Sequence, residues 1–253
     1  MTEWWNKYLN KIRKCKGIGK MVIILPTYNR EKLIHPALVS VMAQTYTTWE
    51  LYILDDASTD GTKSVVDEVC KDDDRVNYIY IDKKSKPTEL HELGCRIAMK
   101  RGEFWTRLAS DDKFANTKIE NDVNFLTNHK EFGAGYGPFY KMNEVGHVLH
   151  VAEESKPMSH SELLDKIKYT FVMSWANIVV RTSVLEKILY KFGHFSHPSL
   201  RNMEDWVFNL MLLLTTTVGW SGDKPQGYYR LHSGQAGADR DIVGKDVDTT
   251  KAL

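Results

Sequence analysis

The stretch Trp49-Glu-Leu-Tyr-Ile-Leu-Asp-Asp-Ala-Ser-Thr-Asp-Gly-Thr62 decides the fold class of this 253-residue chain. Its first half is a short apolar run that predicts a buried strand. The strand ends at two carboxylates, Asp55 and Asp56, and passes into a tight polar turn. Because α/β proteins bind ligands at the carboxyl ends of such strands, we expect an α/β fold with a ligand site at this edge.

Strands and helices alternate on both sides of this stretch. Apolar runs predict further strands at 21–25, 76–81 and 104–108, and apolar residues at helical spacing predict the helices between them, around 33–42, 65–69 and 90–98. Alternation of this kind implies right-handed crossovers and a mainly parallel sheet. The polar residues that follow three of the strands then meet at one edge: Tyr28 and Asn29, Asp55 and Asp56, and Asp111 and Asp112.

The composition is that of a globular protein with a sizeable core. Apolar residues make up 42% of the chain and charged residues 26%, which allows one large or two small domains. The three cysteines are scattered, without a Cys-x-x-Cys pair, so neither a disulfide framework nor a thiolate metal site is indicated. No apolar run approaches the ~20 residues that span a bilayer. We expect a cytoplasmic protein that is neither secreted nor membrane-spanning.

Residues 1–20 form a basic amphipathic extension, although the net charge of the whole chain is only +1. The extension holds six Lys and Arg residues against the single acid Glu3, and its apolar residues share one helical face: Trp4, Trp5, Tyr8, Leu9 and Ile12. Two interpretations follow. The segment packs on the body of the protein with its basic face in water, or it docks on an anionic partner, which is a nucleic acid or a membrane surface.

Two common phosphate-binding motifs are missing from the chain. No Gly-x-Gly-x-x-Gly follows the first strand, and Gly17-Ile-Gly19-Lys20 precedes that strand where a phosphate loop would follow it. A diphosphate held through a divalent cation is the remaining interpretation, because carboxylates are hard oxygen ligands for Mn2+ or Mg2+. Asp111 and Asp112 suit that role.

Nine short motifs, in order and at the right spacing, resemble family 2 glycosyltransferases with the GT-A fold. They are Pro26-Thr-Tyr-Asn-Arg30, Ser40-Val-Met-Ala-Gln-Thr-Tyr46, Asp55-Asp-Ala-Ser-Thr-Asp-Gly-Thr62, Gly102-Glu-Phe104, Ser110-Asp-Asp112, Ser183-Val-Leu-Glu-Lys187, Phe192-Gly-His-Phe195, Glu204-Asp205 and Tyr229-Arg-Leu-His232. The chain is most similar to small, soluble, non-processive members, since it lacks a Gln-x-x-Arg-Trp motif and membrane spans.

The resemblance implies one GT-A domain over residues 21–235. Within it, residues 21–115 would bind the nucleotide sugar, and residues 116–235 would bind the acceptor and supply the catalytic base. The basic extension, 1–20, precedes this domain. Residues 236–253, where glycines and charges replace apolar periodicity, are expected to be a flexible tail.

The same resemblance assigns the donor-binding residues. It places Pro26, Thr27 and Tyr28 around the nucleoside, with Asp56 accepting a hydrogen bond from the uracil ring of a UDP-sugar. Asp111 would meet the ribose.

The metal ligands follow in the same way. Asp112 would hold the Mn2+ or Mg2+ ion that bridges the diphosphate and lowers the charge on the leaving group. The chain reads Ala109-Ser110-Asp111-Asp112 in place of the usual Asp-x-Asp, which leaves the ribose and metal roles of Asp111 and Asp112 open. His232 is a further candidate for contact with the metal or the diphosphate.

Glu204 and Asp205 open a predicted helix whose other residues are apolar. Acids in a first helical turn can serve as simple caps, and the residues alone favour capping and catalysis equally. The resemblance favours Asp205 as the general base that deprotonates an acceptor hydroxyl and inverts the anomeric centre. Glu204, Trp175 and Trp206 would contact the acceptor.

The sequence thus predicts an inverting transferase that moves one sugar from a UDP-sugar to a hydroxyl of a glycan. Three alternatives stay open. The acceptor could be a hydroxylated base in nucleic acid, which only the basic extension favours. A nucleotidyltransferase would share the sheet and the metal-binding carboxylates, but its glycine- and lysine-rich loop is absent. A non-catalytic nucleotide-sugar binding module would bind the donor without turnover.

Overall fold

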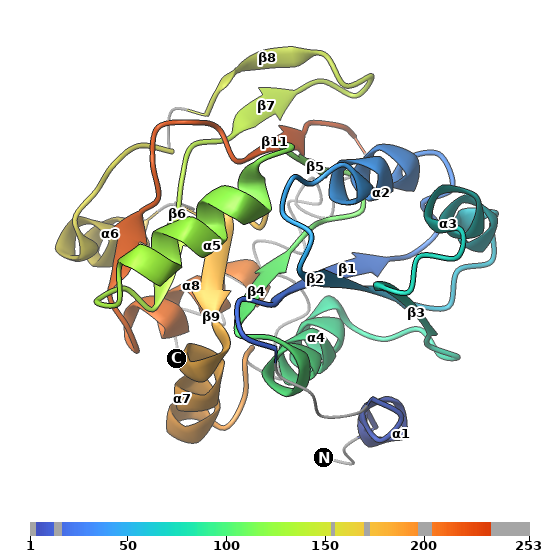
Figure 1. The fold of residues 1–253 in the computed structure, drawn as a ribbon, viewed down its shortest axis with the longest axis horizontal. Helices are drawn as coiled ribbons and strands as arrows, with labels where there is room; N and C mark the ends of the chain where they lie inside the picture. Colours follow the sequence, from blue (N-terminus) through green and yellow to red (C-terminus); the bar gives the residue numbers. More distant parts are fainter. Residues whose placement is uncertain (1–3, 13–16, 153–154, 170–172, 197–203, 234–253) are drawn as a thin grey trace.

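The computed structural model describes residues 4–12, 17–152, 155–169, 173–196 and 204–233, and it confirms the α/β fold (Figure 1). A central seven-stranded sheet has the strand order β10-β6-β9-β4-β1-β2-β3. In chain order these strands are β1 (Met21–Thr27), β2 (Trp49–Asp55), β3 (Val76–Tyr80), β4 (Phe104–Arg107), β6 (Ala134–Tyr136), β9 (Ile178–Arg181) and β10 (Val218–Trp220). The predicted tail, 236–253, lies outside the described residues.

The sheet is mainly parallel, as predicted. Met21 of β1 pairs with Trp49 of β2 and with Phe104 of β4, so these three strands start at one level and run in one direction. β3 continues the parallel order beside β2, whereas β9 runs antiparallel to both β4 and β6. The loops that follow β1, β2 and β4 therefore leave the sheet at the same edge, called here the carboxyl edge.

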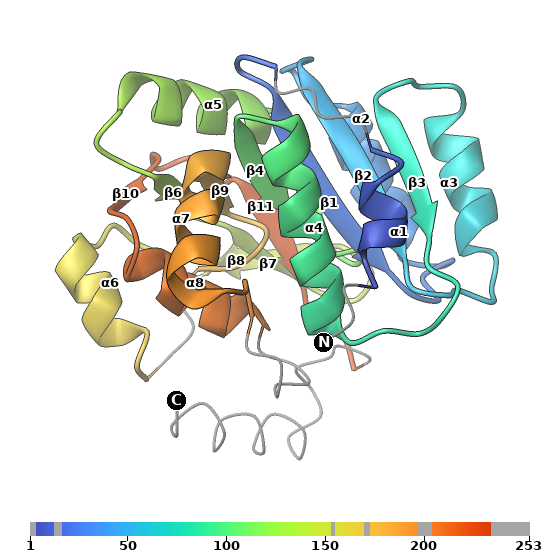
Figure 2. The same cartoon turned by 90° about the horizontal axis from the view of Figure 1, so that it is seen from below.

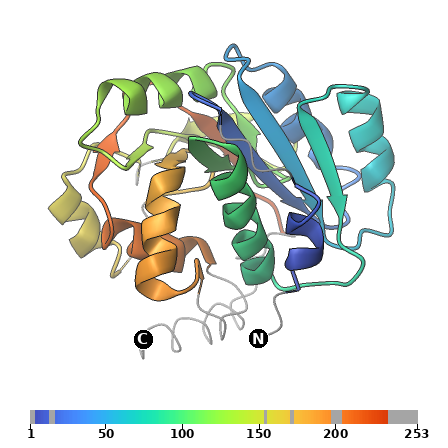
Figure 3. The same ribbon diagram turned by 60° about the horizontal axis from the view of Figure 1, so that its bottom comes forward.

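Alternate residues of β1 enter two separate hydrophobic clusters because successive side chains of a strand point to opposite faces. Val22 and Ile24 pack with α4 (Pro87–Arg101), α6 (His160–Lys166), α7 (Thr182–Phe192) and α8 (Glu204–Leu213). Met21 and Ile23 pack on the other face with α2 (Ile34–Met42), α3 (Thr62–Cys70) and α5 (Lys118–Asn128). Figures 2 and 3 show the resulting three layers.

A second, four-stranded sheet was not predicted. Its order is β5-β11-β7-β8, formed by β5 (Lys113–Phe114), β7 (Tyr140–Met142), β8 (Val148–Val151) and β11 (Gly227–Arg230). The β7–β8 hairpin turns at Gly146, whose φ of 91° suits glycine. β11 pairs with β5 and β7. This pairing brings the end of the described chain against the residues that follow β4.

The described part of the N-terminal segment, residues 4–12, packs on the body of the protein, as the first of the two interpretations requires. Its short helix α1 (Asn6–Leu9) buries Tyr8 and Leu9 in the cluster around α4. The Lys7 ammonium pairs with Asp82 at 2.7 Å, and Lys100 of α4 donates to the carbonyl oxygen of Leu9 at 2.9 Å. No helix among the described residues is long and apolar enough to cross a membrane.

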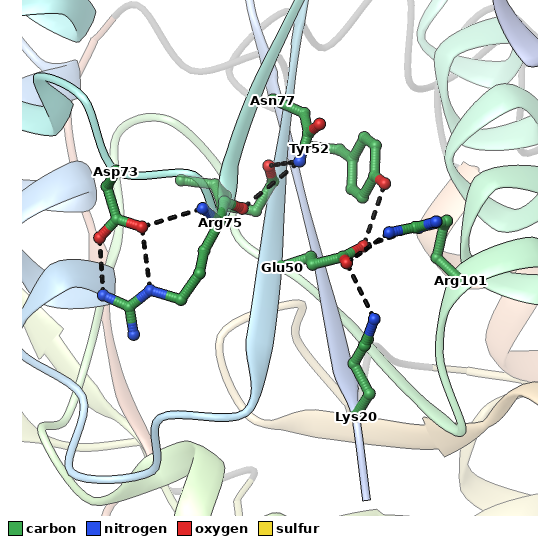
Figure 4. Close-up of polar contacts among 8 residues, drawn as sticks. Lys20, Glu50, Tyr52, Asp73, Arg75, Asn77 and Arg101 are labelled. Carbon is green, nitrogen blue, oxygen red and sulfur yellow. Dashed lines mark hydrogen bonds and ion pairs between the residues drawn. The ribbon is translucent and has the colours of Figure 1, made fainter. Parts of the chain in front are cut away.

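The opposite edge of the sheet, called here the amino edge, is closed by paired charges. Glu50 of β2 accepts hydrogen bonds from Lys20 at 2.9 Å and from Arg101 at 2.6 Å, as Figure 4 shows. Burial opposes ionisation of Glu50, but the two cations overcome it and hold the pKa of this carboxyl below its ordinary value. The charges at the amino edge therefore satisfy one another.

Candidate active site

The loops after β1 and β2 are tied together at the carboxyl edge. The backbone N–H of Asn29 donates to the Ser58 hydroxyl at 2.9 Å, and the Asn29 side chain accepts from the Thr59 N–H at 2.8 Å. Asn29 adopts a left-handed φ of 49°, a conformation that asparagine tolerates better than most residues. These reciprocal bonds fix the position of Tyr28 beside the end of β2.

The two carboxylates at the end of β2 have different hydrogen-bond partners. Asp55 is fully buried and accepts hydrogen bonds from the Ser58 N–H and the Tyr78 hydroxyl, so it holds the loop. Asp56 is 1% exposed and accepts from the N–H and hydroxyl of Ser85 at 2.7 and 2.6 Å. Its second oxygen pairs with the ammonium of Lys84.

Lys84 links Asp56 to Tyr28. Its Nζ lies 2.6 Å from Asp56 Oδ2 and 3.2 Å from the centroid of the Tyr28 ring, which is a cation–π contact. Tyr28 is 42% exposed. Thr27, the last residue of β1, is buried, and its carbonyl oxygen accepts the Asp56 N–H at 2.9 Å. Pro26, one position earlier, is partly buried within the strand.

The acids after β4 lie one strand away from this cluster. The Nε2 of His232 is 3.0 Å from Asp111 Oδ2, and a guanidinium nitrogen of Arg30 lies 3.8 Å from the same oxygen. Asp112 is 3% exposed. Burial, together with the neighbouring Asp111 carboxylate, raises the pKa of Asp112 well above its usual range.

Arg230 of β11 connects these acids to the smaller sheet through hydrogen bonds. Its backbone N–H donates to Asp112 Oδ1 at 2.8 Å, and its Nε donates to the Asp111 carbonyl oxygen at 2.7 Å. The Nη1 atom reaches the carbonyl oxygen of Glu144 in the β7–β8 hairpin, also at 2.7 Å. The hairpin is therefore anchored directly to the acidic pair.

A second acidic pair opens α8, and Arg107 connects it to the sheet. Arg107 is the last residue of β4, and its Nη2 donates to Glu204 Oε1 at 3.0 Å. The side chains of Arg107 and Glu204 are 8% and 12% exposed. This pairing places the start of α8 at the carboxyl end of β4, the same strand end from which the chain continues to Asp111 and Asp112.

Asp205 lies beside this ion pair but is not its acceptor. Its carboxylate accepts a hydrogen bond from the Trp206 N–H at 2.8 Å. Burial and the adjacent Glu204 charge raise the pKa of Asp205 to about 7, and the attraction of Arg107 only partly offsets them. A carboxylate with such a pKa can accept a proton at neutral pH, which is the property of a general base.

The two tryptophans predicted to contact the acceptor pack beneath this pair. Trp175 is 8% exposed and packs against Trp105 and Phe208, with its ring 4.8 Å from the Arg107 guanidinium. The indole N–H of Trp206 donates to the Ile167 carbonyl oxygen at 2.7 Å. Trp175 thus packs against α8, and Trp206, in the first turn of α8, is partly exposed.

The structure thus gathers the predicted residues into two places at one sheet edge. Tyr28 and Asp56 lie together after β1 and β2. At the end of β4, Asp111 contacts His232, and Arg107 contacts Glu204, the neighbour of Asp205. Sequence reasoning missed three cations that hold these acids: Lys84, Arg107 and Arg230. The signal for Arg107 in the sequence was a charged residue within the predicted strand 104–108.

The chemistry of the Asp111–Asp112 pair fits a divalent cation. Two adjacent carboxylates with one raised pKa are the arrangement that a bound dication relieves, and an imidazole nitrogen beside them suits Mn2+. Among the described residues, however, no group of three or more His, Cys, Asp or Glu side chains is arranged to hold a metal ion. A complete coordination shell would need oxygens from the ligand.

Comparison with known proteins identifies the family. Residues 22–189 match the sequence profile of glycosyl transferase family 2. The chain belongs to this family. The match spans both the Asp56 cluster and the acids after β4, so the family 2 glycosyltransferase assignment made from the motifs is confirmed.

Two bacterial relatives align over most of this family 2 chain. An uncharacterized glycosyltransferase of Haemophilus influenzae is 29% identical over 189 residues, which are 74% of this chain and 69% of the relative. The UDP-Glc:alpha-D-GlcNAc-diphosphoundecaprenol beta-1,3-glucosyltransferase WfaP of Escherichia coli is 27% identical over 218 residues, 86% of this chain and 80% of the relative. The chain is thus a glycosyltransferase.

Solved structures confirm the GT-A fold. S. aureus TarS 1-349 in complex with UDP-GlcNAc superposes with a TM-score of 0.68 at 21% identity, over 87% of this chain and 61% of that one. The mannosyltransferase PcManGT from Pyrobaculum calidifontis, in complex with GDP-Man and Mn2+, superposes with a TM-score of 0.61 at 17% identity. The match covers 92% of this chain and 63% of that one. The chain spans about three fifths of these structures.

Proposed function

We propose that this glycosyltransferase transfers one sugar from a UDP-sugar to an acceptor hydroxyl with inversion of configuration, using Asp205 as general base. The observation that carries the proposal is the position of the Asp205 carboxylate, next to the Arg107–Glu204 ion pair at the carboxyl end of β4, where burial and the Glu204 charge raise its pKa to about 7. Residues 21–115 would supply the donor half of the site, and residues 116–235 the acceptor half.

The donor would be held by the cluster at the end of β1 and β2. Tyr28 offers an exposed ring for stacking on the base, beside Pro26 and Thr27. The Asp56 carboxylate would accept a hydrogen bond from the uracil N–H. Lys84 and Ser85 contact both Asp56 oxygens, so the ammonium of Lys84 would shift when the base binds.

The diphosphate would bind between Asp111, Asp112 and His232. Asp112 and Asp111 would supply ligands to a Mn2+ or Mg2+ ion, and oxygens of the diphosphate would complete its shell, so that the ion would neutralise charge on the leaving group. His232 would contact the ion or the diphosphate. Of the two acids, Asp111 is the one that contacts His232 and lies near Arg30, whereas Asp112 is buried against Arg230. Asp111 would therefore also reach the ribose.

Proton transfer would take place at Asp205. Its carboxylate would accept the proton of the acceptor hydroxyl while that oxygen attacks the anomeric carbon from the face opposite the diphosphate. The bond from the anomeric carbon to the diphosphate oxygen would break, and UDP would leave. Arg107 would hold Glu204 close to Asp205, and Glu204, Trp175 and Trp206 would border the acceptor.

The acceptor that we propose is a glycan carried on a lipid diphosphate. The E. coli relative is named for a diphosphoundecaprenol acceptor, and it aligns over most of both chains. The structure offers no support for the nucleic-acid alternative from the N-terminal segment, since the described part of this segment packs on α4 and pairs Lys7 with Asp82.

The test is a transfer assay with Mn2+, a panel of UDP-sugars and a short-chain N-acetylglucosaminyl diphosphate lipid. We expect release of UDP and a product one sugar heavier, whose new anomeric configuration by NMR is opposite to that of the donor. Release of pyrophosphate from a nucleoside triphosphate would instead support a nucleotidyltransferase. Donor binding without turnover would support a binding module.

A further inference from the structure

Arg107, the last residue of β4, has a buried guanidinium that is only partly paired. The residue is 7% exposed. Its Nη2 donates to Glu204 Oε1 at 3.0 Å, whereas Nε and Nη1 are buried without a hydrogen-bond partner among the described residues. Buried N–H groups that lack an acceptor destabilise a folded protein. The stability of the fold therefore gives no reason for an arginine at this position.

Arg181 of the adjacent strand β9 shows how the same side chain serves the fold. Its Nε donates to the Phe132 carbonyl oxygen at 3.0 Å, and its Nη2 donates to the carbonyl oxygens of Leu126 and His129. These acceptors are uncharged backbone groups at the end of α5, so Arg181 connects β9 to that helix. Arg107, in contrast, pairs with one of the two acids that open α8.

An aromatic ring also fixes the position of the Arg107 guanidinium. The central carbon of the guanidinium lies 4.8 Å from the centroid of the Trp175 ring, which is a cation–π contact. The Trp175 ring packs in turn against Phe208 of α8, with centroids 5.6 Å apart. Arg107 is therefore connected to α8 both by the Glu204 ion pair and, through Trp175, by ring contacts.

Glu204 and Asp205 are adjacent in the first turn of α8, so a single cation cannot contact both in the same way. Successive side chains of a helix project about 100° apart. Arg107 donates to Glu204, while the Asp205 carboxylate accepts from the Trp206 N–H. A carboxylate paired with a guanidinium is stabilised as an anion, and an anion beside Asp205 favours proton uptake by Asp205. The ion pair thus makes two similar acids chemically unequal.

The charges that act on Asp205 come from Glu204 in its own helix and from Arg107 in β4. From α4, the His91 ring packs against Phe208 of α8 with centroids 4.9 Å apart. Burial and the nearby Arg107 keep the pKa of His91 well below its usual range, so this imidazole is neutral at pH 7. The helices α6 and α7 enter the hydrophobic cluster around α8 through apolar side chains.

We propose that Arg107 is a positioning residue that assigns the roles of the two acids: it holds Glu204 in an ion pair and leaves Asp205 to take the proton of the acceptor hydroxyl. This role rests on the function proposed above, because it concerns the same proton transfer. A lysine could supply the charge, but not the planar guanidinium that both donates to the carboxylate and lies against the Trp175 ring.

The test compares the pH profiles of kcat for Arg107→Met, Arg107→Lys and the original chain, measured as UDP release with a saturating acceptor. In Arg107→Met, loss of the cation raises the proton affinity of the acidic pair, so the acidic limb should move to higher pH by about one unit or more. The plateau kcat should fall by roughly tenfold or more, because the base is less well positioned. Arg107→Lys keeps the charge, so its limb should stay near pH 7 with an intermediate plateau.

Arg181→Met is the matched control, because it removes a guanidinium that contacts backbone carbonyl oxygens. This variant should have a lower melting temperature and an acidic limb at the original pH. Isothermal titration of UDP with Mn2+ should give the same affinity in all three variants, since both arginines lie outside the proposed donor site.

Two results with Arg107→Met would overturn the proposal. An acidic limb that moves to lower pH contradicts it, and so does a limb that stays in place, even if kcat falls, because Arg107 would then serve only the fold. Failure of the proposed function gives a different result: Asp205→Asn would turn over as fast as the original chain.

A double variant keeps the proposal testable if Arg107→Met does not fold. Arg107→Met/Glu204→Gln removes both members of the ion pair and leaves neither charge buried alone. Because Arg107 attracts the Asp205 carboxylate, the acidic limb of the double variant should lie at higher pH than that of Glu204→Gln. Equal limbs in these two variants would show that Arg107 has no influence on the base.

Discussion

The amino and carboxyl edges of the central sheet both carry buried acidic side chains, but the two edges differ in how nearby cations neutralise these acids. At the amino edge a single carboxylate, Glu50, receives both Lys20 and Arg101, and its pKa is lowered (Figure 4). At the carboxyl edge acids occur as adjacent pairs, and the pKa of Asp112 and of Asp205 is raised. Adjacent carboxylates whose pKa is raised despite nearby cations indicate a ligand site at this edge, whereas a carboxylate balanced by two cations stabilises the fold.

Replacing Asp205 by Asn should give the largest effect. The substitution removes the proposed base, so kcat should fall by roughly 10² to 10⁴, measured as UDP release with a saturating acceptor. The raised pKa means that Asp205 favours the fold when protonated and loses that contribution as the pH rises through about 7. The melting temperature of the Asn variant at pH 8 should therefore be equal or higher. Unchanged turnover would exclude Asp205 as the base.

Replacing Asp112 by Asn should weaken donor binding rather than proton transfer. We expect Mn2+-dependent UDP affinity to fall by about tenfold to a hundredfold, since one proposed metal ligand loses its charge. Isothermal titration of UDP with Mn2+, and again with excess chelator, measures the change. If the variant binds UDP as tightly as the original chain in Mn2+, Asp112 does not hold the metal.

Replacing Glu50 by Gln tests the amino edge. The loss of two charge-assisted hydrogen bonds at a partly buried site should cost about 1 to 3 kcal/mol in the free energy of unfolding, with kcat unchanged. Because the folded pKa of Glu50 is lowered, its contribution is present at neutral pH and disappears as the pH falls from 4.5 through the folded pKa. Urea unfolding should therefore show a difference in stability between the variant and the original chain at pH 7 and a smaller difference at pH 3. If the Glu50→Gln variant keeps its stability but loses activity, the assignment of a purely structural role to the amino edge is contradicted.

Replacing Glu204 by Gln should give the smallest change, a shift of the pH profile. Glu204 raises the pKa of Asp205, so its neutralisation should lower that pKa and also release Arg107 from its partner. The acidic limb of the kcat profile should move to lower pH. A shift to higher pH would mean that Glu204 acts on Asp205 other than through its charge.

The sequence predicted four of the seven strands of the larger sheet, β1 to β4, because three of them are apolar runs followed at once by polar residues. It did not predict β6, β9 and β10, which have three or four residues each. It did not predict the smaller sheet, since strands of two to four residues such as Lys113–Phe114 have no periodicity to detect. The acids of the site were predicted from motifs. Lys84 was missed because it lies in a lysine-rich loop that resembles solvated surface, 28 residues from Asp56 in the sequence.

The most direct test of the account compares two pH profiles of the same protein: kcat/KM for the acceptor, and the affinity for UDP with Mn2+. We predict that kcat/KM rises with pH through an apparent pKa near 7, set by Asp205, while UDP affinity shows no transition there. If both quantities change together through pH 7, or if kcat/KM shows no transition, the proposed division between donor binding and the catalytic base is contradicted.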